Sequence, residues 1–392
     1  MEVATLVEFF SPNPIENVLG AFAFTPRRLV FLVGPGASQD AILSTQRALE
    51  RRIPGIQIRF FSVPDTQLPS IVRTLEELWR EYPDSVFDFT GGSEPMLLSA
   101  YAFAYQHDAP MLHINIQNHC FINIHRCEEL AERFAFPQLT LEDHLSMNGT
   151  FLAGYGYPAP DPQWFSRIRA FCALVLEDQH RWKEQCLFIQ MAAARSPGLT
   201  VDSEPELRTG DGARVSCDPS YLLRLTEIGM LSSAAMVGGR IRFTFPDLQL
   251  RRILCDSGIW LELYTYILVV ESGRFSDVRL SVRMGWGQAE EQSHGTAYNE
   301  IDVVACAGIT PLFISCKSGI PSAGSMNEIL VYARKFGGPR ARAAMVTSTE
   351  LAWGFVGLRK RAADLGTVVV DESDIRAGRA QGMLLYLMDA AL

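Results

Sequence analysis

The sequence predicts an α/β protein with two sheet-containing domains and a small domain between them. In the first 145 residues, short apolar runs rich in Val, Ile and Phe alternate with amphipathic stretches. This alternation is typical of a parallel, doubly wound sheet with helices on both faces. A second alternation of helices and strands begins near Leu250. The length of 392 residues also suits two or three domains.

The N-terminal domain is expected to contain six strands and three main helices. The strands are expected at Thr5–Phe10, Arg28–Gly34, Ile56–Val63, Val86–Thr90, Met111–Ile116 and Phe121–His125. The helices are expected at Gln39–Arg52, Thr66–Arg80 and Glu94–Gln106. In an open parallel sheet, ligands bind beyond the carboxyl ends of the strands.

The middle of the chain predicts a connector. A glycine- and proline-rich stretch at 148–162 indicates a linker, and Trp164–Arg181 indicates a helix. Pro219–Gly229 predicts another helix, followed by two strands that turn at Gly238–Gly239. This order resembles a winged-helix fragment. A helix that reads duplex DNA would carry several basic residues, and only Arg224 is present here, so a packing role is favoured.

The C-terminal part predicts a mixed α/β domain, and the three domains are placed at residues 1–147, 148–250 and 251–392. Helices are expected at Cys255–Val270, Ser325–Phe336 and Glu350–Asp364. Strands are expected at Asp277–Trp286, Glu300–Ala307, Pro311–Cys316 and Ala343–Thr347.

Composition excludes several classes of protein. The formal charge of −9 excludes binding of nucleic acid through bulk positive charge, although a local site or bound metal cations would still allow it. The eight cysteines form no Cys-x-x-Cys pair and predict reduced thiols. No apolar run reaches the length of about 18–20 residues that spans a bilayer. Because the N-terminus is acidic where a secretory signal would be basic, a cytoplasmic protein is expected.

Three residues of the C-terminal domain predict a metal-dependent centre. Glu262 lies within an apolar helix, Asp302 enters a strand, and Lys317 leaves the strand that pairs with it. This order places the acid and the lysine near one rim of the sheet. Oxygen ligands suit Mg²⁺ or Mn²⁺, and a nearby lysine neutralises developing charge. Taken singly, each residue is more commonly a surface carboxylate, a turn cap or a solvated strand end.

Two loops of the N-terminal domain predict a ligand site. Ser11 and Asn13 follow the first strand, and Thr90-Gly91-Gly92-Ser93 follows the fourth. Glycines allow close approach of the backbone, and helix N-termini favour phosphate. A tight strand-to-helix turn capped by Ser93 would use the same residues, so both interpretations stay open.

The histidines at 107, 113, 119 and 125 recur every six residues near the last two strands of this domain. This spacing fits no usual metal site, so structural roles are favoured over metal binding.

The C-terminal motif resembles the PD-(D/E)xK restriction-endonuclease-like superfamily, in which an acid precedes an acid-x-Lys unit. Asp302 matches the first acid, Lys317 the lysine and Glu262 the preceding helical acid. Ser315 stands where the pattern has its second acid. The resemblance implies a metal bound by Glu262 and Asp302, with the carbonyl of Cys316, or a carboxylate from Glu300 or Glu328, as a further ligand.

With both sites considered, the whole chain resembles the CRISPR-associated Rossmann-fold (CARF) nucleases of type III systems. The resemblance rests on Asp88–Ser93, Gly258–Glu262, Asn299–Val304 and Ser315–Gly319. It implies a homodimer that binds a cyclic oligoadenylate, expected to be cyclic tetra-adenylate, through Ser11, Asn13 and the Thr90–Ser93 loop. Glu94 departs from the lysine that the family often carries there.

The expected function is that of an activator-dependent, metal-dependent nuclease that cuts DNA, with single-stranded RNA as a second substrate. Glu262, Asp302, Ser315 and Lys317 are its candidate catalytic residues. The alternative is a ligand-sensing transcriptional regulator with a degenerate nuclease domain. Ser315 favours this alternative slightly, and the low basic content of the middle domain argues against it.

Overall fold

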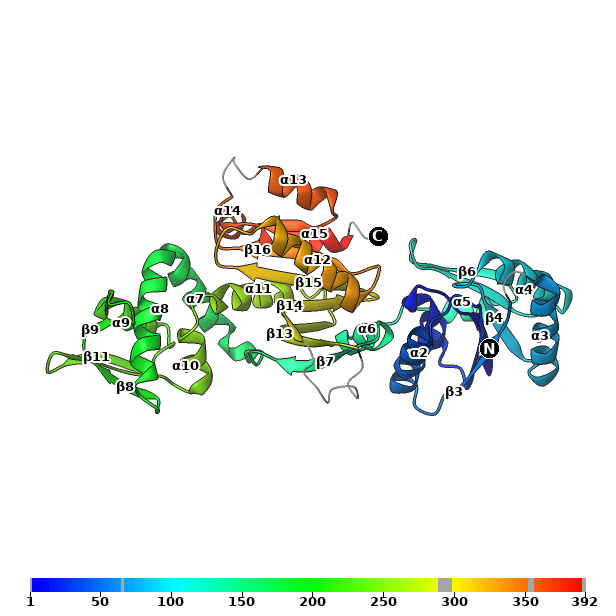
Figure 1. The fold of residues 1–392 in the computed structure, drawn as a ribbon, viewed down its shortest axis with the longest axis horizontal. Coiled ribbons are helices and arrows are strands. Elements are labelled where there is room, and N and C mark those ends of the chain that lie inside the picture. Colours follow the sequence, from blue (N-terminus) through cyan, green and yellow to red (C-terminus); the bar gives the residue numbers. More distant parts are fainter. Residues whose placement is uncertain (1, 65–66, 288–297, 352–355, 390–392) are drawn as a thin grey trace.

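Three lobes follow one another in the computed structural model, which describes residues 2–64, 67–287, 298–351 and 356–389. Figure 1 shows the N-terminal domain at one end, the C-terminal sheet in the centre and the middle segment at the other end. The α/β class predicted from the sequence is confirmed.

The N-terminal domain is built on a six-stranded sheet of order β3-β2-β1-β4-β5-β6. Its strands are β1 (Thr5–Phe9), β2 (Arg28–Val33), β3 (Gln57–Ser62), β4 (Ser85–Asp88), β5 (Met111–Asn115) and β6 (Cys120–His125). Its helices are η1 (Pro14–Asn17), α1 (Leu19–Phe24), α2 (Gln39–Arg52), α3 (Leu68–Glu81), α4 (Glu94–Gln106) and α5 (Glu128–Arg133). Five strands are parallel, and the edge strand β6 runs antiparallel to β5.

Apolar cores fill both faces of this sheet. Leu6 and Phe31 face one core together with α1, whereas Val7 and Phe87 face the other with α3 and α4. Burial on both faces explains why these strands are continuously apolar in sequence. The order places the ends of the adjacent strands β1 and β4 side by side, so the two predicted ligand loops lie next to each other.

The C-terminal domain is also a six-stranded sheet, of order β17-β16-β15-β14-β13-β7. Its strands are β7 (Thr150–Tyr155), β13 (Asp277–Trp286), β14 (Tyr298–Ala307), β15 (Thr310–Lys317), β16 (Arg342–Thr347) and β17 (Val368–Val370). Its helices are α6 (Leu141–Met147), α11 (Ile259–Glu271), α12 (Ala323–Gly337), α13 (Val356–Asp364), α14 (Glu372–Arg376) and α15 (Ala380–Asp389). Part of the predicted helix Glu350–Asp364 lies outside the described residues.

The linker predicted at 148–162 was wrong in its first half. Residues 150–155 form β7, which pairs antiparallel with β13 at the edge of the C-terminal sheet. The helix before it, α6, also packs into this domain through Leu141 and Leu145. Glycines suggested a loop, but Gly154 and Gly156 lie at or just beyond a strand edge. The C-terminal domain therefore recruits residues from the region assigned to the first two domains.

The middle segment contains the predicted hairpin and more. Its elements are η2 (Pro162–Trp164), α7 (Phe165–Glu177), α8 (Gln179–Ala194), β8 (Thr200–Ser203), β9 (Glu206–Arg208), β10 (Arg214–Ser216), α9 (Pro219–Glu227), β11 (Ser233–Val237), β12 (Arg240–Thr244) and α10 (Leu248–Leu254). The helix predicted at Trp164–Arg181 is wrong in extent, because Asp178 adopts an extended conformation and caps a new helix. One hydrophobic core joins Trp182 of this segment to Trp260 of α11.

Among the described residues, no single helix is long and apolar enough to cross a membrane. The helices α10 and α11, which meet at an angle of 114°, together have the length and apolar composition of a membrane-spanning segment, although neither has them alone.

Candidate functional site

The candidate catalytic residues meet where β14 and β15 separate. The antiparallel ladder between these strands ends at the pair Val303–Ile314, and Asp302 is the next residue beyond this end of the ladder. Beyond this point, Asp302 Oδ2 accepts hydrogen bonds from the Cys316 N–H at 2.5 Å and from Ser315 Oγ at 3.4 Å. The carboxylate therefore takes the place of a ladder carbonyl and holds the strands in their open arrangement.

Glu262 approaches this opening from the first turn of α11. Its Oε2 atom is buried and has no hydrogen-bond partner among the described residues. Burial, followed by the negative charge of Asp302, raises the pKa of Glu262 to about 9. Burial also raises the pKa of Asp302, whereas the Cys316 N–H and Lys317 act in the opposite direction. The structure thus brings Glu262, Asp302, Ser315 and Lys317 together, as their order along the chain predicts.

Two further acidic residues add negative charge at this opening. Glu300 accepts hydrogen bonds from Ser281 Oγ at 2.7 Å and Arg283 Nε at 2.8 Å, and its charge raises the pKa of both Glu262 and Asp302. Asp256, which sequence reasoning missed, accepts from the Tyr157 hydroxyl at 2.7 Å. The Asp-Ser-Gly sequence before α11 is a helix-capping signal, but it gives no indication that the residue also faces Glu262.

Glu328 does not join this group, because its carboxylate accepts from the Tyr332 hydroxyl at 2.7 Å on α12. Cys316 turns its thiol toward α11, with Sγ 3.5 Å from Thr265 Oγ1. Burial raises the pKa of this thiol well above its usual value, so a thiolate ligand is disfavoured. Coordination by the carbonyl of Cys316 stays a prediction.

The donor set suits a hard divalent cation. In the parts of the chain that the structure describes, no three His, Cys, Asp or Glu side chains converge as a ready metal-binding group. Mg²⁺ commonly takes only one or two carboxylates and keeps several waters. The unpartnered Glu262 oxygen and the nearby Asp302 carboxylate meet this requirement, because a cation would compensate two acids that burial penalises.

The predicted ligand loops of the N-terminal domain touch each other. Gly92 has a φ of +112°, and a Cβ atom there would lie 2.4 Å from Phe9 Cβ. A Cβ at Gly91 would lie 3.0 Å from Ser11 Cβ. The glycine pair is therefore required by the close approach of the β4–α4 loop to the end of β1, whether or not a ligand binds.

Polar groups at these loops are partly satisfied and partly free. Glu16 accepts from Ser11 Oγ at 2.6 Å and from Asn13 Nδ2 at 2.8 Å. In contrast, Asn13 Oδ1 and Ser93 Oγ are buried and have no hydrogen-bond partner among the described residues. Ser93 precedes α4 as its N-cap residue, but its side chain makes no capping hydrogen bond. The unsatisfied atoms favour the ligand-site interpretation over the purely structural turn.

The four regularly spaced histidines contact different partners. His125 Nε2 lies 2.7 Å from Asp108 Oδ1, and His113 Nδ1 lies 3.0 Å from the Phe89 carbonyl. The rings of the other two pack against aromatic neighbours, His107 on Phe103 and His119 on Phe136.

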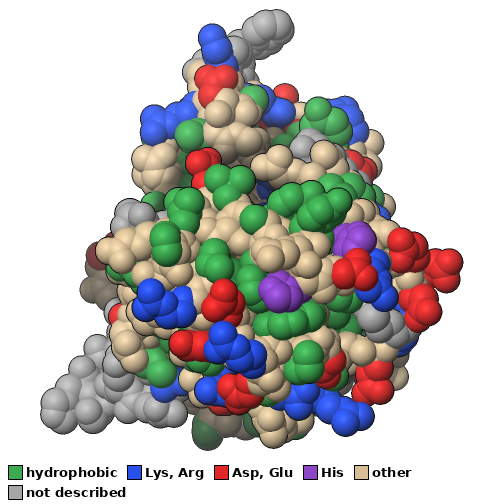
Figure 2. Space-filling view, turned by 90° about the vertical axis from the view of Figure 1, so that its right-hand side faces the viewer, with side chains coloured by type: hydrophobic (Ala, Val, Ile, Leu, Met, Phe, Trp, Pro, Cys, Tyr) green, Lys and Arg blue, Asp and Glu red, His purple; other side chains and the backbone are tan. Residues whose placement is uncertain are grey.

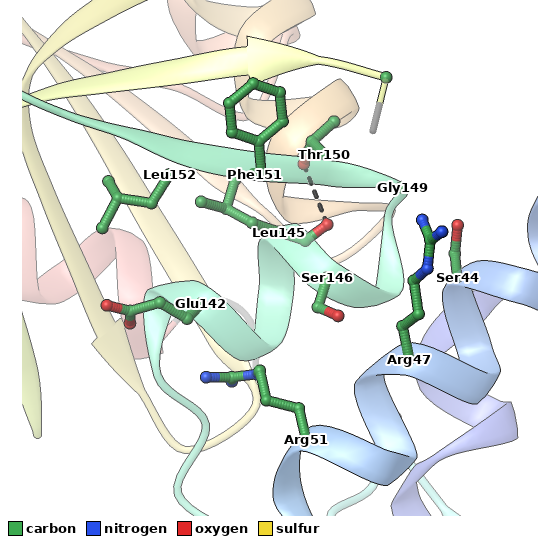
Figure 3. A pocket seen from close by; sticks show the side chains of 11 residues that line it. Ser44, Arg47, Arg51, Glu142, Leu145, Ser146, Gly149, Thr150, Phe151 and Leu152 are labelled. Carbon is green, nitrogen blue, oxygen red and sulfur yellow. Dashed lines mark hydrogen bonds between the residues drawn. The ribbon is translucent and has the colours of Figure 1, made fainter. Parts of the chain in front are cut away.

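A cationic junction connects the N-terminal domain to the C-terminal sheet. Arg51 and Arg52 of α2 both pair with Asp143, a buried residue in the first turn of α6. Beside this contact lies a cavity of about 290 Å³. Figure 3 shows Arg47 and Arg51 extending from α2 on one side of it, opposite α6 and β7. These ion pairs connect the N-terminal domain to α6, which packs against the sheet that carries Asp302.

The arginines of the middle hairpin are ion-paired. Arg240 pairs with Asp202 and Glu204, and Arg242 pairs with Asp202. This neutralisation is consistent with a connector.

The comparisons with known proteins agree with this arrangement. Residues 248–376 match the family model described as the Card1-like endonuclease domain, and the match includes Glu262, Asp302 and Lys317. Comparison with curated proteins gives no match.

Solved structures share the fold of nearly the whole chain. Protein VC1899 from Vibrio cholerae is similar with a TM-score of 0.74 and 18% identity, over 99% of this chain and 98% of that one. Can2 from Sulfobacillus thermosulfidooxidans, in complex with cyclic tetra-adenylate, is similar with a TM-score of 0.67 and 18% identity, over 97% of this chain and 99% of that one. A type III CRISPR defence DNA nuclease activated by cyclic oligoadenylate is similar with a TM-score of 0.50 and 16% identity, over 90% of this chain and 47% of that one. These similarities agree with the resemblance drawn from the sequence: residues 248–376 match the model of the Card1-like endonuclease domain, and nearly the whole chain shares its fold with VC1899 and Can2.

Proposed function

We propose that this protein is a metal-dependent nuclease of type III CRISPR defence that cyclic tetra-adenylate activates. One observation carries the proposal: Glu262, Asp302 and Lys317 converge at the splayed ends of β14 and β15, inside the Card1-like endonuclease domain. Its substrates are DNA and, secondarily, single-stranded RNA. The match to a nuclease domain and the convergence of Glu262, Asp302 and Lys317 favour this function over a transcriptional regulator, although Ser315 replaces one acid of the usual pattern.

Glu262 and Asp302 would hold the divalent cation. When bound, the cation supplies charge stabilisation at the phosphoryl centre and a more acidic water. Lys317, which lies close enough to lower the pKa of both carboxyls, orients the attacking water and neutralises charge that develops on the phosphate. Ser315 replaces the acid of the usual pattern and acts differently, because it donates its hydroxyl hydrogen to Asp302 and fixes that carboxylate.

Cyclic tetra-adenylate would bind at the N-terminal loops. Ser11, Asn13 and Thr90–Ser93 lie at the adjacent ends of β1 and β4, and Asn13 Oδ1 and Ser93 Oγ are available for hydrogen bonds. A two-fold ligand suits a homodimer, in which each protomer presents the same loops to half of it.

An exposed apolar surface supports the homodimer. It consists of Leu98, Tyr101 and Tyr105 on α4, with Ile122 and Ile124 on β6. Figure 2 views the molecule from its N-terminal end and shows hydrophobic side chains gathered among the charged ones. Burial of such a patch between two copies would stabilise the dimer.

Plasmid cleavage tests the proposal. Supercoiled plasmid and single-stranded RNA are incubated separately with the protein and Mn²⁺, with and without cyclic tetra-adenylate, and with EDTA in a parallel arm. Cleavage that requires both Mn²⁺ and the activator is expected. Absence of cleavage in every arm, together with a metal-independent shift of a promoter fragment, would instead establish the regulator.

A further inference from the structure

Two buried carboxyl groups of the N-terminal domain take no part in the sites described so far. Glu8 and Asp88 are directly opposite each other in the parallel ladder of β1 and β4. Their side chains therefore project from the same face of the sheet. Glu8 is 2% exposed and Asp88 1% exposed, and both lie in the apolar core that α1 covers.

Both carboxyl groups approach the same point above the sheet. A Cβ atom added to Gly20 of α1 would lie 2.2 Å from Asp88 Oδ2 and 2.8 Å from Glu8 Oε1. Glycine at this position is therefore what makes room for the two acids under the helix. Their proximity comes from the fold itself and does not depend on a flexible surface arrangement.

Most oxygens of this pair lack a hydrogen-bond donor. In the described part of the chain, Glu8 Oε1, Glu8 Oε2 and Asp88 Oδ2 have no hydrogen-bond partner of normal geometry, and the nearby Ala21 N–H of α1 opposes only part of the effect of burial on the pKa of Glu8. The titratable groups near Asp88 are His113 on β5 and the Cys127 thiol before α5, and neither supplies an ion pair. Two uncompensated charges in an apolar core would be costly, so the pair must retain a proton. Burial accordingly raises the pKa of Glu8 well above its usual value and that of Asp88 to about 6.

The remaining oxygen connects the pair to the ligand loop. Asp88 Oδ1 accepts from the Thr90 N–H at 2.9 Å and also from the Thr90 hydroxyl. Thr90 Oγ1 in turn accepts from the Ile114 N–H at 2.8 Å, which ties the loop to β5. Asp88 thus lies next to Glu8 in the sheet and is hydrogen-bonded to the first residue of the Thr90–Ser93 loop.

We propose that Glu8 and Asp88 share one proton, and that Glu8 is a positioning residue that keeps Asp88 in place as the acceptor that shapes the activator loop. This inference rests on the proposed function of that loop. While the proton is shared, Glu8 bridges to Asp88 Oδ2 and leaves Oδ1 for Thr90. When the proton is lost, the two carboxylates repel each other and Asp88 can no longer hold Thr90 in one arrangement. Activator affinity therefore falls as the pH rises.

The test uses the full chain and its Glu8→Gln variant, whose amide replaces the shared proton with a permanent donor. Affinity for cyclic tetra-adenylate is measured by titration calorimetry between pH 6 and 9. The wild type is expected to lose affinity by about tenfold across this range, whereas Glu8→Gln keeps its affinity. Glu50→Gln, an exposed residue of α2, is the matched control and should follow the wild type. Parallel profiles for the wild type and Glu8→Gln would overturn the proposal.

A second readout needs no activator. Because the folded protein binds the proton of Glu8 more tightly than the unfolded chain does, wild-type stability decreases as the pH rises above about 4.5. Thermal unfolding of the wild type should therefore shift downward between pH 5 and 9 relative to Glu8→Gln. If the difference in unfolding temperature between the two proteins does not change with pH, the proposal of a shared proton is overturned, even if no activator binds. Absence of activator binding at every pH would instead contradict the proposed function.

Discussion

This molecule contains two pairs of buried carboxyl groups, and their surroundings give them different roles. Glu262 and Asp302 lie where two strands separate, beside Lys317 and with an unpartnered oxygen. Glu8 and Asp88 lie on two paired parallel strands and are buried under α1, and no lysine or arginine of the described residues forms an ion pair with them. The first pair lies at an open strand end beside a lysine, and therefore suits the proposed catalysis. The second has neither, and therefore suits the control of loop geometry.

This comparison shows that burial of an acid does not by itself identify an active site. Raised pKa values occur in both pairs, from burial in each case. The distinguishing features are the open end of the ladder and the lysine. Substitutions in one pair should consequently affect cleavage, and substitutions in the other should affect activator binding.

The largest effect is expected for Asp302→Asn. The amide keeps the size of the side chain but removes the charge that would bind the cation, so activated cleavage should fall by at least about 10²-fold. Plasmid cleavage rates with Mn²⁺ and activator provide the measurement. Asp211→Asn, in the exposed β9–β10 turn, is the control. A variant that cuts at the wild-type rate would remove Asp302 from the catalytic group.

Gly20→Ala should strongly destabilise the second pair. Because the added methyl group would collide with Asp88 Oδ2, the free energy of unfolding should drop by about 1–3 kcal/mol. Urea unfolding measures this loss. Gly36→Ala is the matched control, since nothing lies within 4 Å of its added Cβ. Equal stability of the two variants would show that α1 does not confine the acids.

Glu262→Gln should alter the pH dependence of the metal-free protein. The folded-state pKa of about 9 lies above the usual value of 4.5, so the wild type loses stability as the pH rises between these two values. The amide does not titrate, and its advantage over the wild type should grow from pH 5 to pH 8. Thermal unfolding in EDTA over this range gives the measurement. An advantage that stays constant would mean that Glu262 is ionised throughout.

The smallest effect is expected for Glu16→Gln. The Glu16 carboxylate accepts hydrogen bonds from Ser11 Oγ and Asn13 Nδ2. We propose that these two donors face the activator phosphates. Removal of this negative charge should raise activator affinity by about two- to fivefold, less at high salt. Calorimetry at two salt concentrations tests this, with Glu50→Gln, an exposed residue of α2, as control. Weaker binding would show that Glu16 supports the loop and does not compete with the ligand.

Much of the fold could be predicted from the sequence because its strands are buried and strongly apolar. The helices Gln39–Arg52 and Glu94–Gln106 and the strand Asp277–Trp286 have the predicted bounds. The strand β7 could not be recognised, because its glycines and its pairing with a strand more than 120 residues away leave no local pattern. The break at Asp178 was missed because the apolar periodicity of α7 continues into α8.

The candidate catalytic site was predictable from the positions of its residues relative to strand ends. Asp302 and Lys317 flank a hairpin whose pairing brings them to one rim. Asp256 and Glu8 were not predictable, since the role of each depends on a neighbour that only the tertiary fold supplies. Glu8 in particular looks like one polar residue in an apolar strand until its register partner Asp88 is known.

The central claim is that one domain senses the activator while the acid–lysine cluster of the other cuts nucleic acid. Activator affinity and plasmid cleavage measured on the same sample of Lys317→Ala test it most directly, with Lys360→Ala, in the exposed face of α13, as control. The account predicts wild-type affinity for cyclic tetra-adenylate and no cleavage in Lys317→Ala, with both properties retained in the control. Cleavage by Lys317→Ala at the wild-type rate would contradict it.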